Sequence, residues 1–202
     1  GTVRAIVNID LHLGANLANG SQLIGQHLLT GKEVAPLTSA IDTIFLSEHP
    51  TKNVPVVAPL RKKNRKLIKS AELICYPPGS FYSSLLANLL PQGVGRSIAE
   101  NDCPKVFIPN LGTDPEQFGL NLDEAVTKLI AQLKQDCEPN MPTSKLLNFV
   151  LLDSSNGIYP SSLTKQALTD QGIQLIDTPL VSKQSAPYYD NNLLVSALMS
   201  LV

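Results

Sequence analysis

Residues 73–90 constrain the fold most, because they predict a strand, a sharp turn and a helix in direct succession. Leu73–Tyr76 is a short apolar run, which is typical of a buried strand. Pro77–Gly79 ends the strand, and Ser80 is a residue type favoured at the start of a helix. The predicted helix carries apolar residues at helical spacing, namely Phe81, Leu85, Leu86, Leu89 and Leu90.

This arrangement predicts an anion-binding turn. The first N–H groups of a helix have no partner within the helix, and the helix dipole favours negative charge there. Gly79 lacks the Cβ that would keep a ligand away from the backbone, and the Ser80 hydroxyl can cap the helix or bind an anion. Ser83 and Ser84 add two hydroxyls in the first turn. The turn alone leaves two interpretations open, a phosphate site or an ordinary capped turn.

Length and composition are those of a folded domain. The 202 residues suit one domain or one and a half, with 43% hydrophobic and 16% charged residues. The net charge of −1 argues against nucleic acid as a partner, and no apolar run approaches the ~18 residues of a membrane span. No signal peptide opens the chain, and the three cysteines are widely spaced, so we expect a reducing cytoplasm without a zinc site or disulfides.

The order of the elements predicts two structural parts. In residues 1–50, Ala5–Ala18 and Gln22–Leu29 predict a β-hairpin around Asn19-Gly20, and Ile41–Leu46 predicts a third strand. Beyond residue 50, strands alternate with helices, which predicts parallel crossovers and a sheet covered on both faces. We expect strands at 73–76, 105–109, 146–152 and 174–176, and helices at 60–71, 80–90, 94–101, 122–133, 161–170 and 191–202.

The expected fold class is therefore α/β. It consists of a Rossmann-like, mostly parallel sheet flanked by helices, with an N-terminal antiparallel β-hairpin excursion. Residues 1–50 would form the excursion, and residues 51–202 would form a compact core of the nucleotide-binding type.

A second polar loop follows the predicted strand that begins at Lys105. Ligands of open α/β sheets bind beyond the carboxyl ends of the strands. Asn110 and Thr113 would lie beside the turn if the two strands are neighbours. Asp114 and Glu116 of this loop could hold a metal ion, but two loop carboxylates are more often solvated, and no metal ligand is predicted.

A basic cluster precedes the turn. Six of the chain's 16 basic residues lie in Arg61–Lys69, so the rest of the chain has 10 positive against 17 negative charges. The cluster could attract a phosphate-rich ligand or a partner, although a solvated helix face is the more common meaning of such a pattern. His12, His27 and His49 are too scattered for a set of metal ligands, and His12 and His27 would face each other across the hairpin.

Three segments together carry a family resemblance. They are Pro78-Gly-Ser-Phe-Tyr-Ser-Ser-Leu-Leu-Ala-Asn-Leu-Leu90, then Gly93, then Pro104-Lys-Val-Phe-Ile-Pro-Asn110. They resemble the 2-phospho-L-lactate transferase (CofD)-like family, which includes the YvcK-type gluconeogenesis factors. Pro77 stands where the family has a glycine, and Ser83 stands where it has a threonine. The opening hairpin is similar to a β excursion of the YvcK-type branch, so the resemblance covers almost the whole chain.

The resemblance implies a nucleotide site of which this chain holds only one part. Family members begin with a strand and a Gly-rich loop followed by acidic residues, and this chain looks like the C-terminal two thirds of such a protein. We therefore expect it to be inactive alone. Glycine, serine and tyrosine residues of the turn would contact a phosphate or a ring, and two asparagines would orient the ligand. The predicted ligand-binding residues are Gly79, Ser80, Tyr82, Ser83, Asn88, Asn110 and Thr113.

Two functions follow from the resemblance. The first is a transferase that moves a phospho-ester group from a nucleotide diphosphate conjugate. In the transferase branch a phospholactyl group passes from a guanosine diphosphate conjugate to a deazaflavin alcohol with Mg²⁺, mainly through positioning and charge stabilisation. The alternative is a non-catalytic regulator that binds a nucleotide or nucleotide sugar, as in the YvcK-type branch.

The expected partner is a nucleotide-containing small molecule. Mg²⁺ is a cofactor by resemblance only, and no tightly bound cofactor, membrane or nucleic acid is expected. A homodimer through an exposed sheet edge is a third possibility. The YvcK-type branch has Arg-His-Asp before its last helix, whereas this chain has Tyr188-Tyr189-Asp190. Here Asp190 would cap the helix, and the tyrosines would pack.

Overall fold

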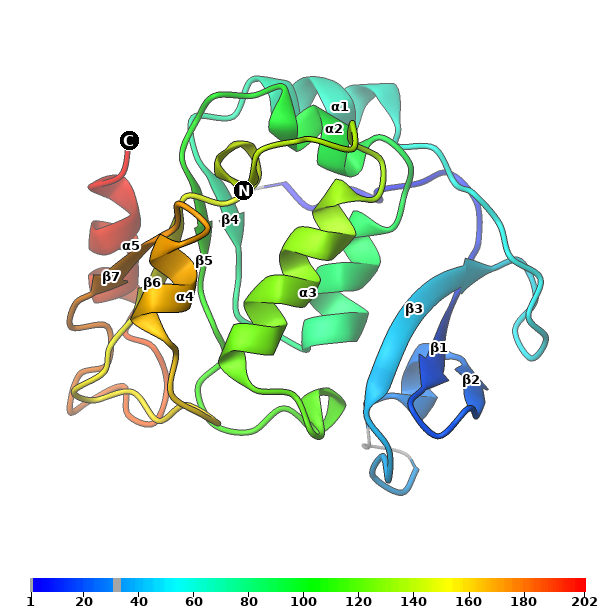
Figure 1. Cartoon of the computed structure of the whole chain (residues 1–202), viewed down its shortest axis with the longest axis horizontal. Helices are drawn as coiled ribbons and strands as arrows, with labels where there is room; N and C mark the ends of the chain where they lie inside the picture. Colours follow the sequence, from blue (N-terminus) through cyan, green and yellow to red (C-terminus); the bar gives the residue numbers. More distant parts are fainter. Residues whose placement is uncertain (1, 31–33) are drawn as a thin grey trace.

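The structure, a computed structural model, describes residues 2–30 and 34–202. Its centre is a parallel sheet in the order β4-β5-β6-β7, flanked by helices (Figure 1). This architecture confirms the predicted α/β class with a parallel sheet. The strands are β4 (Ile74–Tyr76), β5 (Lys105–Phe107), β6 (Phe149–Leu152) and β7 (Gln174–Asp177).

The α-helices lie where the apolar spacing predicts them, although most are shorter than expected. None of the helices in residues 2–30 and 34–202 has the length and apolar character needed to cross a membrane. In the first of these helices, the apolar Leu67 is 49% exposed, whereas the polar Asn64 is buried. The helices are α1 (Lys62–Lys69), α2 (Val94–Ala99), α3 (Leu122–Lys134), α4 (Lys165–Thr169) and α5 (Asn191–Met199).

Both faces of the sheet are covered, as the sequence predicts. Successive residues of a strand point to opposite faces. Phe107 and Val150 belong to the larger hydrophobic cluster, which includes α2 and α3. Their neighbours Val106 and Leu151 face the other way and pack in a second cluster with α5. β4 forms one edge of the sheet, and a homodimer through this edge stays a prediction.

The segment after β4 differs from the predicted α-helix. Phe81–Leu85 forms η2, a π-helical turn, and Leu86–Leu89 forms η3, a 3-10 helix. The wide turn is visible in the backbone, because the Leu85 N–H donates to the Ser80 carbonyl five residues earlier (3.2 Å). Apolar residues of this segment still enter the core, so their spacing predicted the buried face correctly but not the type of helix.

The antiparallel excursion is a three-stranded sheet in the order β2-β1-β3. Asn19-Gly20 forms the predicted turn, with the Gly20 N–H bonded to the Leu17 carbonyl (2.9 Å). The first strand begins at His12 rather than at residue 5, and His12 pairs with Ser47 rather than with His27. The strands are β1 (His12–Leu17), β2 (Gln22–Ile24) and β3 (Ile41–Ser47).

This small sheet shares the larger hydrophobic cluster with the parallel sheet. Leu13, Ala15 and Ile44 are buried in the same cluster as residues of α3. In addition, the hydroxyl of the buried Tyr82 donates to the Ile41 carbonyl of β3 (3.0 Å). The division of the chain at residue 50 into two domains stays a prediction.

We expect Tyr82→Phe to lower the free energy of unfolding by about 1–2 kcal/mol, because it leaves the buried Ile41 carbonyl without this donor. Urea unfolding of the variant and the wild type measures the change. Tyr188→Phe is the matched control, since Tyr188 is 74% exposed, and it should stay within about 0.5 kcal/mol. Equal stability of the two variants would contradict a structural role for the Tyr82 hydroxyl.

Candidate site at the carboxyl edge of the sheet

Two loops meet where β4 and β5 end. Pro77–Ser80 leads from β4 into η2, and Asn110–Gln117 follows β5 and ends in η4 (Pro115–Gln117). The Asn110 side chain joins the loops, because its Oδ1 accepts from the Gly79 N–H (2.5 Å) and its Nδ2 donates to the Gly79 carbonyl (2.5 Å). Asn110 therefore lies beside the turn, as expected for neighbouring parallel strands.

The start of η2 is capped by two carboxylates of the second loop. Asp114 Oδ2 accepts from the Phe81 N–H (2.7 Å). Glu116 Oε2 accepts from the N–H groups of Tyr82 (3.0 Å) and Ser83 (2.8 Å), and its Oε1 accepts from the Ser83 hydroxyl. The N–H groups that the sequence predicts as an anion site therefore already bind carboxylates of the same chain.

Two expectations for this region are wrong. Ser80 precedes η2, but its side chain makes no capping hydrogen bond. Glu116 is not solvated, since it is only 1% exposed. The sequence Asp-Pro-Glu contains a signal that could have been used, because Asp114 also caps η4 by accepting from the Glu116 N–H (3.1 Å).

Burial raises the pKa of Glu116 above its ordinary value, and the negative charge of Asp114 acts in the same direction. The hydrogen bonds from Ser83 and Tyr82 oppose this rise, because they stabilise the ionised form. Glu116 is thus a buried acceptor that the fold holds in place with three donors.

The predicted ligand-binding residues divide into three groups. Gly79, Ser80, Asn110 and Thr113 lie in the two loops, and none of them is fully buried. Tyr82 and Ser83 point into the interior. Asn88 is exposed in η3, where its Nδ2 donates to the Ser84 carbonyl (2.6 Å). Ligand contact by any of these residues stays a prediction.

A third loop contains an acidic residue that the sequence analysis missed. Asp153 follows β6, is 1% exposed, and accepts from the N–H groups of Leu180 (2.8 Å), Val181 (3.0 Å), Ser155 (3.1 Å) and Asn156 (2.9 Å). Burial acts to raise its pKa, but these donors lower the pKa to about 2. The available signal was an acidic residue after a buried strand, followed by Ser-Ser-Asn-Gly, which is typical of an Asx turn.

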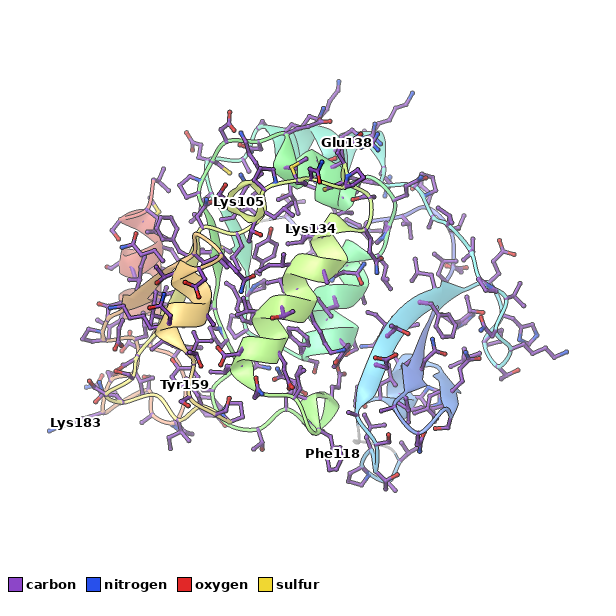
Figure 2. All side chains as sticks on the ribbon, in the orientation of Figure 1. Lys105, Phe118, Lys134, Glu138, Tyr159 and Lys183 are labelled. Carbon is purple, nitrogen blue, oxygen red and sulfur yellow. The ribbon has the colours of Figure 1, made fainter. Side chains whose placement is uncertain are left out.

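Two tyrosines connect the loops along this edge. The hydroxyls of Tyr159 and Tyr189 lie 3.3 Å apart, and the Tyr189 hydroxyl donates to the Pro109 carbonyl (2.7 Å). Tyr189 packs as predicted, whereas Tyr188 is exposed, and Asp190 caps α5 as predicted by accepting from the Asn192 N–H (2.9 Å). Figure 2 shows Tyr159 at the same end of the molecule as Phe118.

Space for a ligand differs between the parts of the site. The cavity at the turn, bounded by Gly79, Asn110 and Gln117, has a volume of about 10 Å³, which suits a single water. A hollow of about 460 Å³ lies between the N-terminal segment, the antiparallel sheet and η2–η3. Its polar lining consists of Asp10, His12, Gln26 and Ser83. This volume is within the range of small-molecule sites.

Binding of Mg²⁺, which the resemblance implies, stays a prediction. In residues 2–30 and 34–202, no three His, Cys, Asp or Glu side chains are grouped as metal ligands. Asp114, Glu116 and Asp153 use their carboxylates as acceptors for backbone N–H groups. These three residues therefore position the loops that follow β5 and β6.

Comparison with known proteins identifies the family and agrees with the fold. The family described as "2-phospho-L-lactate transferase CofD" matches residues 1–194. The chain belongs to this family.

The curated relatives are longer than this chain. It is 25% identical over 216 residues to a protein of Thermoanaerobacterium thermosulfurigenes named "Putative gluconeogenesis factor". This match covers 100% of the chain and 61% of that protein. It is 30% identical over 115 residues to the gluconeogenesis factor of Listeria monocytogenes, covering 56% of the chain and 31% of that protein. The chain thus spans less than two thirds of the length of these relatives.

Solved structures show the same fold. The crystal structure of a UPF0052 family member from Bacillus halodurans is similar with a TM-score of 0.71 at 17% identity, over 94% of this chain and 58% of that chain. A second structure of a protein from Bacillus halodurans gives a TM-score of 0.72 at 16% identity, over 96% and 60% of the two chains. At such low identity the likeness concerns the fold alone.

Removing the cap of η2 should destabilise the protein. Glu116→Ala leaves three buried donors on Tyr82 and Ser83 without an acceptor, so we expect the free energy of unfolding to fall by about 3 kcal/mol or more in urea unfolding. Glu138→Ala is the matched control, because Glu138 is exposed. A loss no larger than that of the control would show that the cap contributes little.

Acid should reveal the contribution of Asp153. Because its pKa in the folded protein is about 2, below the ordinary 3.8, its stabilisation is complete above pH ~4 and is lost as the pH falls toward 2. This loss is on the order of 2 kcal/mol. Urea unfolding from pH 7 to pH 2 should show the loss in wild type and in Asp42→Asn, but not in Asp153→Asn, which should be destabilised already at pH 7. The same acid profile in Asp153→Asn would contradict the assignment.

Proposed function

We propose that this chain forms part of a regulator of the gluconeogenesis-factor type, which binds a nucleotide-containing small molecule without turning it over. The ligand would occupy the 460 Å³ hollow between the antiparallel sheet and η2–η3. We further propose a cytoplasmic location, which is supported by the free thiols of Cys75, Cys103 and Cys137.

The lining of the hollow is the main support for this proposal. It combines apolar walls with a few polar groups, which is the usual make-up of a small-molecule site. Asp10 and Gln26 can bind hydroxyl or amino groups of a base or a sugar, and the His12 ring can stack or donate. Ser83 and Ala87 of the family motif form the opposite wall, so the family pattern and the hollow coincide.

The cap of η2 favours binding over turnover. Catalysis of phosphoryl transfer depends on donors and positive charges aimed at the transferring group. The N–H groups of Phe81, Tyr82 and Ser83 are already bonded to Asp114 and Glu116. The names of the curated relatives, which are gluconeogenesis factors, support the same choice.

A transferase of the 2-phospho-L-lactate type is the second candidate, because the family description names that activity. Incubation with a phospholactyl guanosine diphosphate conjugate, a deazaflavin alcohol and Mg²⁺, followed by chromatography, distinguishes the two functions. Formation of product by the chain, or by the relative from Thermoanaerobacterium thermosulfurigenes, would contradict the regulator proposal and support the transferase.

Calorimetry tests ligand binding directly. We expect binding of guanosine diphosphate or of a uridine diphosphate sugar by the chain, or at least by the same longer relative. His12→Ala should weaken binding about tenfold, because His12 lines the hollow, which corresponds to about 1.4 kcal/mol. His27→Ala is the control, since His27 is exposed outside the lining.

Absence of binding to both proteins would contradict the proposed function. Binding that is equally weakened by the two histidine variants would place the ligand outside the hollow.

A further inference from the structure

A charged cleft of about 160 Å³ lies between α1, α2 and the end of α3. The last residues of α1 and α2 lead into β4 and β5, so the cleft lies at the amino edge of the sheet, away from the loops of the candidate site (Figure 1). Figure 2 shows Lys134, the last residue of α3, at this end of the molecule. The polar and charged groups that line the cleft include Arg65, Lys69, Gln92, Arg96, Glu100 and Asp136.

Arg65 reaches the cleft because residue 93 is a glycine. Gly93 has a φ of +99°, and a Cβ at this position would lie 3.1 Å from Arg65 Nη2. Arg96 extends from α2 on the same lining. In residues 2–30 and 34–202, neither guanidinium takes part in a salt bridge, so their N–H donors stay available to a ligand.

Glu100 lies among three cations. Its Oε2 pairs with Lys69 Nζ. The hydrogen bond from Lys69, together with the positive charges of Lys69, Arg96 and Arg65, holds the pKa of Glu100 below its ordinary value. The side chains of Lys69 and Glu100 are 46% and 44% exposed, and an ion pair this exposed contributes little to stability. The carboxylate can therefore be displaced at low cost.

The second acid of the cleft, Asp136, is hydrogen-bonded to the backbone. Asp136 accepts from the N–H groups of Gly93 and Arg96, so both of its oxygens face the start of α2. The lining has three positive and two negative side chains. Lys62 and Lys66 on the exposed surface of α1 increase the positive potential, which attracts anions.

We propose that this cleft binds a small phosphate-bearing anion, which replaces the Glu100 carboxylate as the partner of Lys69 and is also bound by Arg65 and Arg96. Guanidinium groups bind phosphate through paired N–H donors, and an ammonium group adds a point charge. A volume of about 160 Å³ admits a phosphate group with a few further atoms, and it is smaller than the sites that take drug-sized ligands. The site is separate from the proposed nucleotide hollow.

Calorimetric titration with inorganic phosphate and with pyrophosphate at low ionic strength tests the proposal. Lys69→Gln and Arg65→Gln should each weaken binding at least about tenfold, because each removes a charged donor. Lys63→Gln is the matched control, since it makes the same charge change on α1 outside the lining, and it should change the affinity less than about twofold. Glu100→Gln should strengthen binding about threefold or more, because it removes the competing carboxylate.

Equal weakening by Lys63→Gln and Lys69→Gln would overturn the site, because it would show attraction by bulk charge alone. No binding at millimolar phosphate would overturn it as well, as would unchanged affinity in Glu100→Gln. Glu100→Gln keeps all the cationic side chains, so it tests the site even if a cationic variant does not fold. Urea unfolding checks that each variant is folded. Failure of this site would leave the nucleotide proposal untouched, because His12 and the hollow are not part of it.

Discussion

The capping of η2 by Asp114 and Glu116 is the interaction on which the rest of the structure depends. It binds the loop after β5 to the loop after β4 across more than thirty residues of sequence. The two carboxylates together occupy three successive N–H groups, and the wide π-helical turn begins at the same residues. This turn directs Tyr82 inward, where its hydroxyl reaches β3. These two acids, of which Glu116 is buried, thus connect the parallel sheet, the irregular helix and the antiparallel sheet.

Local patterns in the sequence predicted most of the architecture. Short apolar runs located the parallel strands, and Asn19-Gly20 located the hairpin turn, because both depend on residues that are neighbours in the chain. The type of helix after β4 could not be predicted in this way. Spacing of apolar residues shows which face is buried, but it does not distinguish an α-helix from a π-helical turn followed by a 3-10 helix. That choice depends on acceptors supplied by Asp114 and Glu116.

The candidate site shows the same division between local and distant information. Asn110 was predicted beside the turn because parallel neighbouring strands bring their carboxyl ends together. Asp153 was missed because two of the donors that hold its charge come from Leu180 and Val181, far along the chain. The N–H groups at the start of η2, which the sequence predicts as an anion site, bind carboxylates of the same chain. Contact between this turn and a ligand stays a prediction.

The two ends of the parallel sheet therefore differ in charge, and this difference bears on how a nucleotide would be held. At the carboxyl edge, the carboxylates of Asp114 and Asp153 are bonded to backbone donors. A phosphate brought to the start of η2 would meet like charges at short range, and repulsion between anions is strong where water is scarce. In the proposed nucleotide site we therefore expect Asp10, His12 and Gln26 to contact the base or the sugar, with the phosphates directed away from η2.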